Sequence, residues 1–222
     1  MDGATQRERK TNRAPRPYHK GHVAEDMRAA AIAILAKERL EDVTLRRLTR
    51  EVGVTPANFY NHFPSVDDLL MDIAADGFDE LRLAASQAWD RDSGKIDRLV
   101  ILATEFVRFG CRKPQLLRLM FGYRANGGRH RRFHHAANNA FAELVRLIYD
   151  EDRFDPEDSA ASHEHCRIAY GFFAFCYGLA RTVGTGQFDL DLESGPDLDH
   201  FVERTVRPFL DGSVIETVTS SD

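Results

Sequence analysis

Apolar residues recur along most of the chain with the period of an α-helix. From Val23 to Leu35 they return every three or four positions, which places them on one face of a 3.6-residue repeat. The same spacing reappears in later segments, and no segment alternates polar and apolar residues as a β-strand does. The sequence therefore predicts an all-α fold.

Capping residues divide the first part of this pattern into separate helices. Thr44 is a good N-cap for a short second helix that ends at Gly53, a residue that tolerates positive φ. Thr55 caps a third helix with Pro56 at its first position, where a missing N–H costs nothing. Ser65 caps a fourth helix that we expect to run to about residue 88. Further helices are expected near 95–112, 114–122, 129–150, 157–184 and 196–210.

Charge is distributed unevenly along the chain. The net charge of the whole chain is -5, yet residues 1–20 carry six basic side chains against two acidic ones. Those residues have no apolar periodicity, so we expect a flexible basic arm. Residues 21–66 are balanced, which leaves the acidic excess in the remainder. A basic end on an acidic body indicates that this end meets phosphate.

Several protein classes are disfavoured by composition and motifs. No apolar run approaches the ~20 residues of a membrane span, and the polar first twenty residues lack a signal-peptide core, so we expect a cytoplasmic protein without membrane contact. The three cysteines form no CxxC pair and are expected to stay reduced. Without a glycine-rich phosphate loop, nucleophile elbow or zincin motif, we expect neither an enzyme nor a bound cofactor.

The segment from Thr44 to Leu70 has the pattern of a helix-turn-helix. Its second helix keeps few residues for the core, and no acidic residue lies on it, which suits a DNA major groove. Helix N-termini at Thr44, Thr55 and Ser65 offer free amides to phosphate. A plain helical hairpin has the same local pattern and stays open as an alternative. The residues left free for DNA are Pro56, Ala57, Asn58, Tyr60, Asn61 and His62, with Arg46, Arg47 and Arg50 on the outer face of the preceding helix.

This segment resembles the DNA-binding domain of the TetR family of transcriptional repressors. The likeness covers roughly residues 21–70 and consists of Thr44, the turn Val52-Gly53-Val54-Thr55, and Phe59-Tyr60-Asn61-His62-Phe63. The resemblance implies that Thr44, Thr55, Tyr60 and His62 contact phosphate and that Pro56, Ala57 and Asn58 lie nearest the bases. It also implies that Phe59 and Phe63 anchor the recognition helix to the core.

One position departs from the family pattern. Val66 stands where the family usually has a phosphate-binding lysine. We therefore expect weaker DNA binding that depends more on Arg47, Arg50 and the arm. Within the arm, Arg13 and Arg16 are expected to enter a narrow, A·T-rich minor groove.

The C-terminal helices indicate pairing of two copies. Residues 157–184 are apolar on more than one side, and 196–210 add a further apolar face, so together they suit a four-helix bundle across a two-fold axis. The expected organisation is an arm at 1–20, a DNA-binding domain at 21–66, a ligand-binding and dimerisation domain at 67–215 and a tail at 216–222. A homodimer would place two recognition helices ~34–36 Å apart on a palindromic operator.

Bulky side chains in the middle helices predict a mainly apolar cavity for a small-molecule effector that releases the DNA. Aromatic stripes of this kind also occur in an ordinary core, and both interpretations stay open. The expected lining residues are Phe106, Phe109, Met120, Phe121, Tyr123, Phe133, His134, Phe141, Tyr170, Phe173 and Tyr177.

Two histidine clusters leave a metal-sensing repressor open. The first comprises His130, His134 and His135, and the second runs from His163 to Cys166. Arginines at 129, 131 and 132 oppose a metal at the first cluster and suit an anion instead. A non-specific architectural DNA-binding protein is the remaining alternative.

Overall fold

The computed structural model describes residues 22–88, 93–122, 130–149, 166–184 and 196–211, and these residues contain helices and no strand, which confirms the all-α prediction. The helices are α1 (Val23–Leu35), η1 (Leu40–Asp42, a 3₁₀ turn), α2 (Leu45–Val52), α3 (Pro56–Tyr60), α4 (Val66–Ala88), α5 (Lys95–Arg112), α6 (Pro114–Gly122), α7 (Arg131–Tyr149), α8 (Arg167–Gly184) and α9 (Pro196–Asp211).

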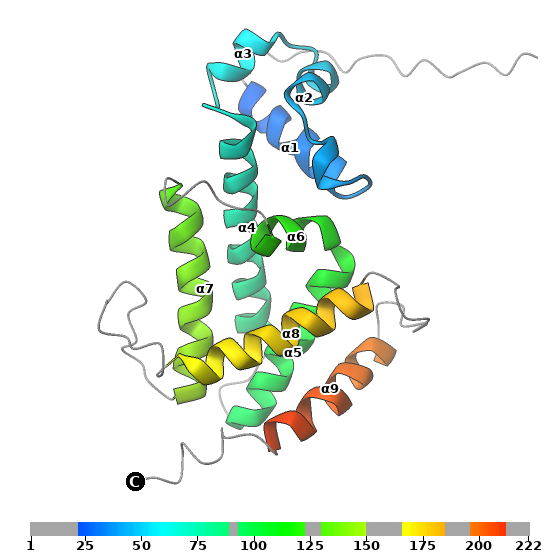
Figure 1. The fold of residues 1–222 in the computed structure, drawn as a ribbon, viewed down its shortest axis with the longest axis vertical. Helices are drawn as coiled ribbons and strands as arrows, with labels where there is room; N and C mark the ends of the chain where they lie inside the picture. The colour runs from blue at the N-terminus through cyan, green and yellow to red at the C-terminus, as the bar shows by residue number, and fades with distance from the viewer. Residues whose placement is uncertain (1–21, 89–92, 123–129, 150–165, 185–195, 212–222) are drawn as a thin grey trace, which may run out of the picture.

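Helices α1, α2 and α3 gather at one end of the molecule, around the first turns of α4 (Figure 1). Their shared core consists of fully buried apolar side chains, among them Met27, Leu48 and Phe59. On α1, Ala31 is fully buried and the preceding Ala30 is half-buried. This small unit presents α3 at its outer end.

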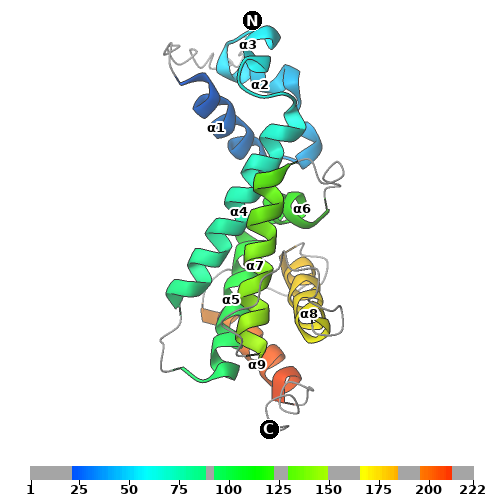
Figure 2. The same ribbon diagram turned by 90° about the vertical axis from the view of Figure 1, so that its left-hand side faces the viewer.

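Helix α4 runs without a break from this end into the rest of the molecule (Figures 1 and 2). Its interior Gly77 has a packing reason: a Cβ there would lie 2.7 Å from Met120 Sδ and 3.4 Å from Leu116. The glycine thus lets α6 approach α4 closely. One helix consequently carries the small N-terminal unit and also forms a wall of the larger one.

The larger unit is arranged around α4 and α5. Helix α7 lies along α4, while α8 and α9 pack against α5 and α6 lies beside α4 and α5 (Figures 1 and 2). Helix α8 buries Ala169, Phe172, Cys176, Ala180 and Val183, a single stripe at helical spacing. Within the described ranges, no helix is long and apolar enough to cross a membrane.

Candidate nucleic-acid interface and ligand cavity

The turn between α2 and α3 depends on one glycine. Gly53 ends α2 with φ 77° and ψ 32°, in the left-handed region, and its N–H donates to the Thr49 carbonyl. A left-handed residue at this position turns the chain sharply and satisfies the last helical carbonyls. The chain can therefore begin α3 after only Val54 and Thr55.

Helix α3 is short and well capped. Thr55 Oγ1 accepts a hydrogen bond from the Asn58 N–H at 3.2 Å, and Pro56 occupies the first helical position. Phe59 is fully buried and Phe63 nearly so, with ring centroids 5.6 Å apart. These two rings hold a helix of one and a half turns that has little stability of its own.

The outer face of α3 is open and uncharged. Pro56, Ala57, Asn61 and His62 are exposed, and 57% of Tyr60 is accessible although its ring packs edge-on against Phe59. These predicted contact residues thus form one projecting surface at the end of the molecule, together with the exposed capping residues Thr44 and Thr55. Such a surface fits a major groove without repelling phosphate.

Asn58 differs from the prediction that it is free. The residue is half-buried, and its Oδ1 lies inside the protein without a hydrogen-bond partner. Its main-chain N–H meanwhile caps the helix through Thr55. The sequence did not predict the burial of Asn58, because this polar residue lies between the exposed Ala57 and the buried Phe59, where the helix surface turns towards the core.

Arg47 is a second difference from the prediction. Its Nε donates to Glu51 Oε1 at 2.8 Å and its Nη2 to Glu38 Oε1 at 2.9 Å, so it is engaged within the domain. The hydrogen bond with Glu51 raises the pKa of Arg47 above its usual value. Arg46 and Arg50 are exposed and have no ion-pair partner among the described residues. These two arginines are the free cations of α2.

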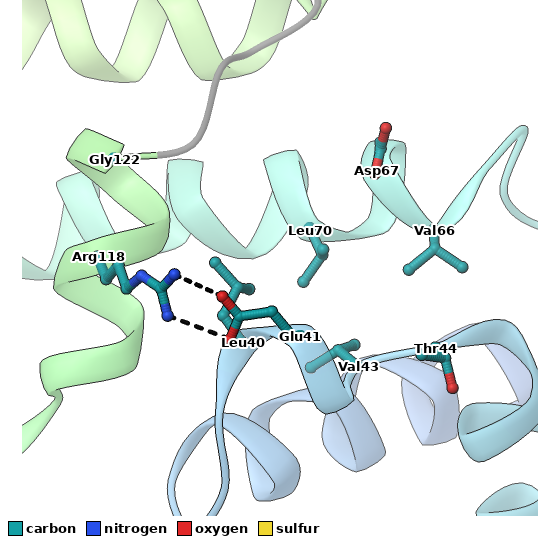
Figure 3. A pocket seen from close by; sticks show the side chains of 9 residues that line it. All are labelled: Leu40, Glu41, Val43, Thr44, Val66, Asp67, Leu70, Arg118 and Gly122. Carbon is teal, nitrogen blue, oxygen red and sulfur yellow. Dashed lines mark hydrogen bonds and ion pairs between the residues drawn. The ribbon is translucent and has the colours of Figure 1, made fainter.

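The start of α4 shows where Val66 points. Ser65 Oγ accepts from the Asp68 N–H at 3.0 Å and donates to Asp68 Oδ2 at 2.6 Å, which caps the helix. Val66 itself lines a hollow of about 330 Å³ between η1, α4 and α6 (Figure 3). Its side chain is therefore part of a junction between the N-terminal unit and the rest of the molecule.

An ion pair closes this junction. Arg118 on α6 donates from Nη1 to Glu41 Oε2 at 3.1 Å and from Nη2 to the other carboxylate oxygen, a two-point contact (Figure 3). The hydrogen bond from Arg118 lowers the pKa of Glu41. Beside it, the Leu40 N–H donates to Gln115 Oε1 at 3.1 Å. Helix α6 is thus attached to η1, which immediately precedes α2.

A second cavity, of about 370 Å³, lies among α4, α5, α6, α7 and α8. Its wall is mainly aromatic and aliphatic. Phe121 is central to it, with ring centroids 5.1 Å from Phe78, 5.8 Å from Phe106 and 5.0 Å from Phe173. Its volume lies within the range of small-molecule sites, which are mostly apolar with a few polar groups.

Seven of the eleven residues predicted for a ligand site line this cavity, three do not, and the eleventh, Tyr123, lies outside the described residues. Phe109 is buried outside the cavity wall, where Lys113 Nζ lies over its ring. Tyr177 does not line the cavity either, but its ring packs on two residues that do, Phe121 and Phe173. His134 lies beside Phe133 with Nε2 buried and unpaired. The seven lining residues are Phe106, Met120, Phe121, Phe133, Phe141, Tyr170 and Phe173.

Helix α4 supplies a wall of the cavity that the sequence did not predict. Phe78, Leu81 and Ala85 line the cavity at helical spacing, and Leu102 and Phe172 add to it from α5 and α8. The stripe on α4 continues the one that packs against α1, so its apolar pattern does not change where the core ends and the cavity begins. The lining also has polar side chains, which belong to Arg82, Ser86, Glu143 and Tyr170.

One thiol lines the cavity as well. Cys176 is buried, and loss of water around it raises its pKa to about 12. The half-buried Cys111 also has a raised pKa because of burial. Both groups are neutral thiols near neutral pH, which makes them poor nucleophiles and poor metal ligands.

The histidines of the first cluster contact different partners and do not converge on one point. His130 Nε2 lies 3.6 Å from Asp72 Oδ1, while His135 Nε2 shares a 3.0 Å hydrogen bond with Asn139. No group of three potential metal ligands occurs within the part of the chain that the structure describes. Three residues of the second cluster, 163–165, lie outside that part.

Comparison with known proteins agrees with the helix-turn-helix. Residues 28–73 match the family described as bacterial regulatory proteins, tetR family. A relative with 25% identity over 167 residues, 74% of this chain and 83% of its own length, is the nucleoid occlusion factor SlmA of Edwardsiella ictaluri (strain 93-146).

Solved structures share the whole fold. A protein of unknown function from Rhodococcus sp. RHA1 matches with a TM-score of 0.67 and 29% identity, over 88% of this chain and 97% of its own. A bacterial regulatory protein in the tetR family from Rhodococcus RHA1 matches with a TM-score of 0.56 and 19% identity, over 84% and 98%. The resemblance drawn from Thr44 to Phe63 is confirmed, because it lies within residues 28–73, which match the DNA-binding helix-turn-helix domain of the tetR family of bacterial regulatory proteins.

Proposed function

We propose that this protein is a homodimeric repressor that releases a palindromic operator when a small, mainly apolar ligand fills the cavity among α4, α5, α6, α7 and α8. The observation that carries the proposal is the course of α4. This one helix supports the exposed surface of α3 at its first turns and supplies Phe78, Leu81 and Ala85 to the cavity further along. Occupancy at one place therefore acts on the orientation of the other.

On the DNA, we assign contacts by exposure and charge. Tyr60 and His62, with the capping residues Thr44 and Thr55, are placed to meet phosphate around α3. Because Arg47 is engaged by Glu38 and Glu51, we assign the phosphate contacts of α2 to Arg46 and Arg50, the other two arginines expected there. Pro56 and Ala57 would lie nearest the bases, and the half-buried Asn58 would contribute less to base contact than its exposed neighbours.

Pairing of two copies is assigned to the outer faces of α8 and α9. Gly171, Ala174 and Gly178 form an exposed line of small residues along α8. Phe175 stacks on Phe209 of α9 at 4.5 Å and 4°, and Phe209 is itself exposed. Small residues flanked by aromatic rings allow two helices to approach closely across a two-fold axis.

The ligand is assigned as small and mainly apolar because rings and aliphatic groups dominate the lining. A ligand that favours a spacing of the recognition helices that does not fit the operator weakens DNA binding. Because binding at two sites is linked, DNA weakens ligand binding by the same factor.

Operator selection followed by fluorescence anisotropy tests the DNA half of the proposal. The full chain should bind one selected duplex as two protomers, much more tightly than a scrambled duplex. Tyr60→Ala should remain dimeric and lose about 1.5 kcal/mol per protomer, on the order of 100-fold per dimer. Equal affinity for both duplexes would favour a non-specific architectural protein, and full affinity in Tyr60→Ala would contradict the placement of α3.

A thermal-shift screen of apolar compounds tests the ligand half. A compound that raises the melting temperature should also release the selected duplex, and Phe121→Ala should weaken both effects together. Compounds that stabilise the protein without releasing DNA would contradict the proposed regulation.

The arm is tested separately, since residues 1–21 lie outside the described part. Deleting residues 1–16 removes five basic side chains, so the affinity for the operator should fall and its salt dependence should flatten. An unchanged affinity and salt slope would remove Arg13 and Arg16 from the DNA contacts.

A further inference from the structure

A line of three carboxylates runs along α4 at the junction of the two units. Asp72, Asp76 and Asp79 are spaced four and three residues apart and therefore share one face of the helix. Asp72 is half-buried and the other two are more exposed. Both neighbouring helices, α1 and α7, direct basic side chains to this line.

From the DNA-binding side, the contact is made by Arg28 of α1. Its guanidinium pairs with Asp76 Oδ2, and its Nη1 lies 3.6 Å from Asp72 Oδ2. The Arg28 side chain is 26% exposed, so solvent screens this contact less than it screens a fully exposed pair. Helix α1 packs on α2 and α3, and Arg28 therefore ties the whole N-terminal unit to two carboxylates of α4.

From the cavity side, the same carboxylates are held by Arg132 of α7. Its Nη2 pairs with Asp76 Oδ1, and its Nη1 donates to the Asp72 carbonyl at 2.9 Å and lies 3.5 Å from Asp72 Oδ1. The hydrogen bond with Asp76 raises the pKa of Arg132. Asp76 thus has one carboxylate oxygen on each arginine, Oδ2 on Arg28 and Oδ1 on Arg132.

The residue after Arg132 is part of the cavity wall. Phe133 lines the cavity, with its ring centroid 5.7 Å from that of Phe78 on α4. A ligand that enters beside these two rings separates α7 from α4. Close-packed side chains cannot be compressed, so the helices that carry them have to move apart. Movement of Phe133 carries Arg132 with it, since the two are consecutive in the first turn of α7.

We propose that Asp76, shared between Arg28 and Arg132, is the positioning residue through which occupancy of the cavity changes the seating of the DNA-binding unit. When α7 moves, Arg132 withdraws and both carboxylates turn to Arg28. The angle between α1 and α4 then changes, and with it the separation of the two recognition helices of a dimer. This inference rests on the proposed function, whose regulation it specifies.

The test uses a substitution as the occupant, so that no natural ligand is needed. Ala137 lines the cavity, and Ala137→Phe fills part of it. The affinity for the selected operator is measured by anisotropy for the full-length wild type, Ala137→Phe, Arg132→Met and the double variant. Thermal unfolding and light scattering serve as controls that each variant is folded and dimeric.

We expect Ala137→Phe to weaken operator binding about 10-fold in the wild-type background and less than 3-fold in the Arg132→Met background. Arg131→Met is the matched control, because Arg131 is the exposed neighbour of Arg132 and has no ion-pair partner among the described residues. It should leave the full 10-fold effect in place. Arg132→Lys, which keeps the charge but not the two-point geometry, should retain part of it.

The outcomes separate this inference from the function on which it rests. An equal effect of Ala137→Phe with and without Arg132 would overturn the role of Asp76 while leaving regulation by the cavity intact. Loss of the effect in Arg118→Met alone would assign the coupling to α6 and η1 instead. No effect of Ala137→Phe in any background would contradict the proposed function itself.

Discussion

At the scale of single residues, Gly53 sets the geometry of the DNA-binding unit. Its φ of 77° lies in the left-handed region, and a Cβ there would meet nothing within 4 Å. Strain in the backbone, and not crowding, is therefore the whole cost of a side chain at this position. A substitution series can measure that strain directly.

Gly53→Ala should lower the free energy of unfolding by about 1 kcal/mol, and Gly53→Asn by clearly less, because asparagine tolerates the left-handed region. Urea unfolding of both variants measures the difference. Equal losses would indicate that crowding or a lost contact, and not backbone strain, governs the position.

Cys176 gives a second prediction at this scale. With its pKa raised to about 12, the thiol stays protonated at pH 8, so iodoacetamide should label it only after denaturation. Mass spectrometry of the native and the denatured protein provides the measurement. In the native protein Cys111 should react first, since it is only half-buried. Rapid native labelling of Cys176 would show that its surroundings stabilise the thiolate.

At the scale of elements, helices α5 and α8 approach each other closely at Gly110. A Cβ on Gly110 would lie 2.9 Å from Ala180 Cβ and 3.0 Å from Leu117 Cδ2. The backbones of α5 and α8 thus pack with almost no side chain between them. This contact holds α8, and with it one wall of the cavity, against α5.

Gly110→Ala should destabilise the protein by about 1–3 kcal/mol through overpacking. Ala180→Gly alone should cost about 1 kcal/mol from helix propensity. The double variant should be more stable than Gly110→Ala, because the added and the removed methyl groups face each other. Thermal unfolding of the three variants is the measurement, and additive losses would show that the two positions do not meet.

Local signals explain which elements the sequence predicted. The bounds of α4, α5 and α6 agree with expectation because Ser65, Gly94 and Pro114 mark their starts within the chain itself. The 3₁₀ turn η1 was not predicted. Besides its local hydrogen bond between Arg39 and Asp42, it is contacted by Gln115 and Arg118, more than seventy residues away.

The same reasoning applies to the sites. The exposed face of α3 follows from local capping, and five of its six expected residues are exposed as predicted. The pairing of Arg47 with Glu38 bridges nine residues and depends on how α1 and α2 fold together. The α4 wall of the cavity has the same hydrophobic spacing as a core stripe, so only the packed structure separates the two.

At the scale of the whole molecule, the outer face of α8 should determine assembly. Ala174 is exposed at the middle of the small-residue line and a turn or less from both Gly171 and Gly178. A long charged side chain there would stand between two paired helices, whereas within one chain it would point to solvent.

Ala174→Arg should therefore convert a dimer to a monomer while hardly changing helix content. Light scattering and circular dichroism measure the two properties. Operator affinity should fall steeply as well, because each monomer then holds only one half-site. Gly171→Ser is a milder control that should remain dimeric. A dimeric Ala174→Arg would move the interface to another face.

The unbroken course of α4 has a further mechanical consequence. Its 23 residues form a rod of about 34 Å at 1.5 Å per residue. A tilt of about 5° at the cavity end displaces the far end of such a rod by about 3 Å, close to the rise of one base pair at about 3.4 Å. In the proposed symmetric dimer the two displacements would add, so a small expansion of the cavity would shift the recognition helices by more than one base pair along the duplex.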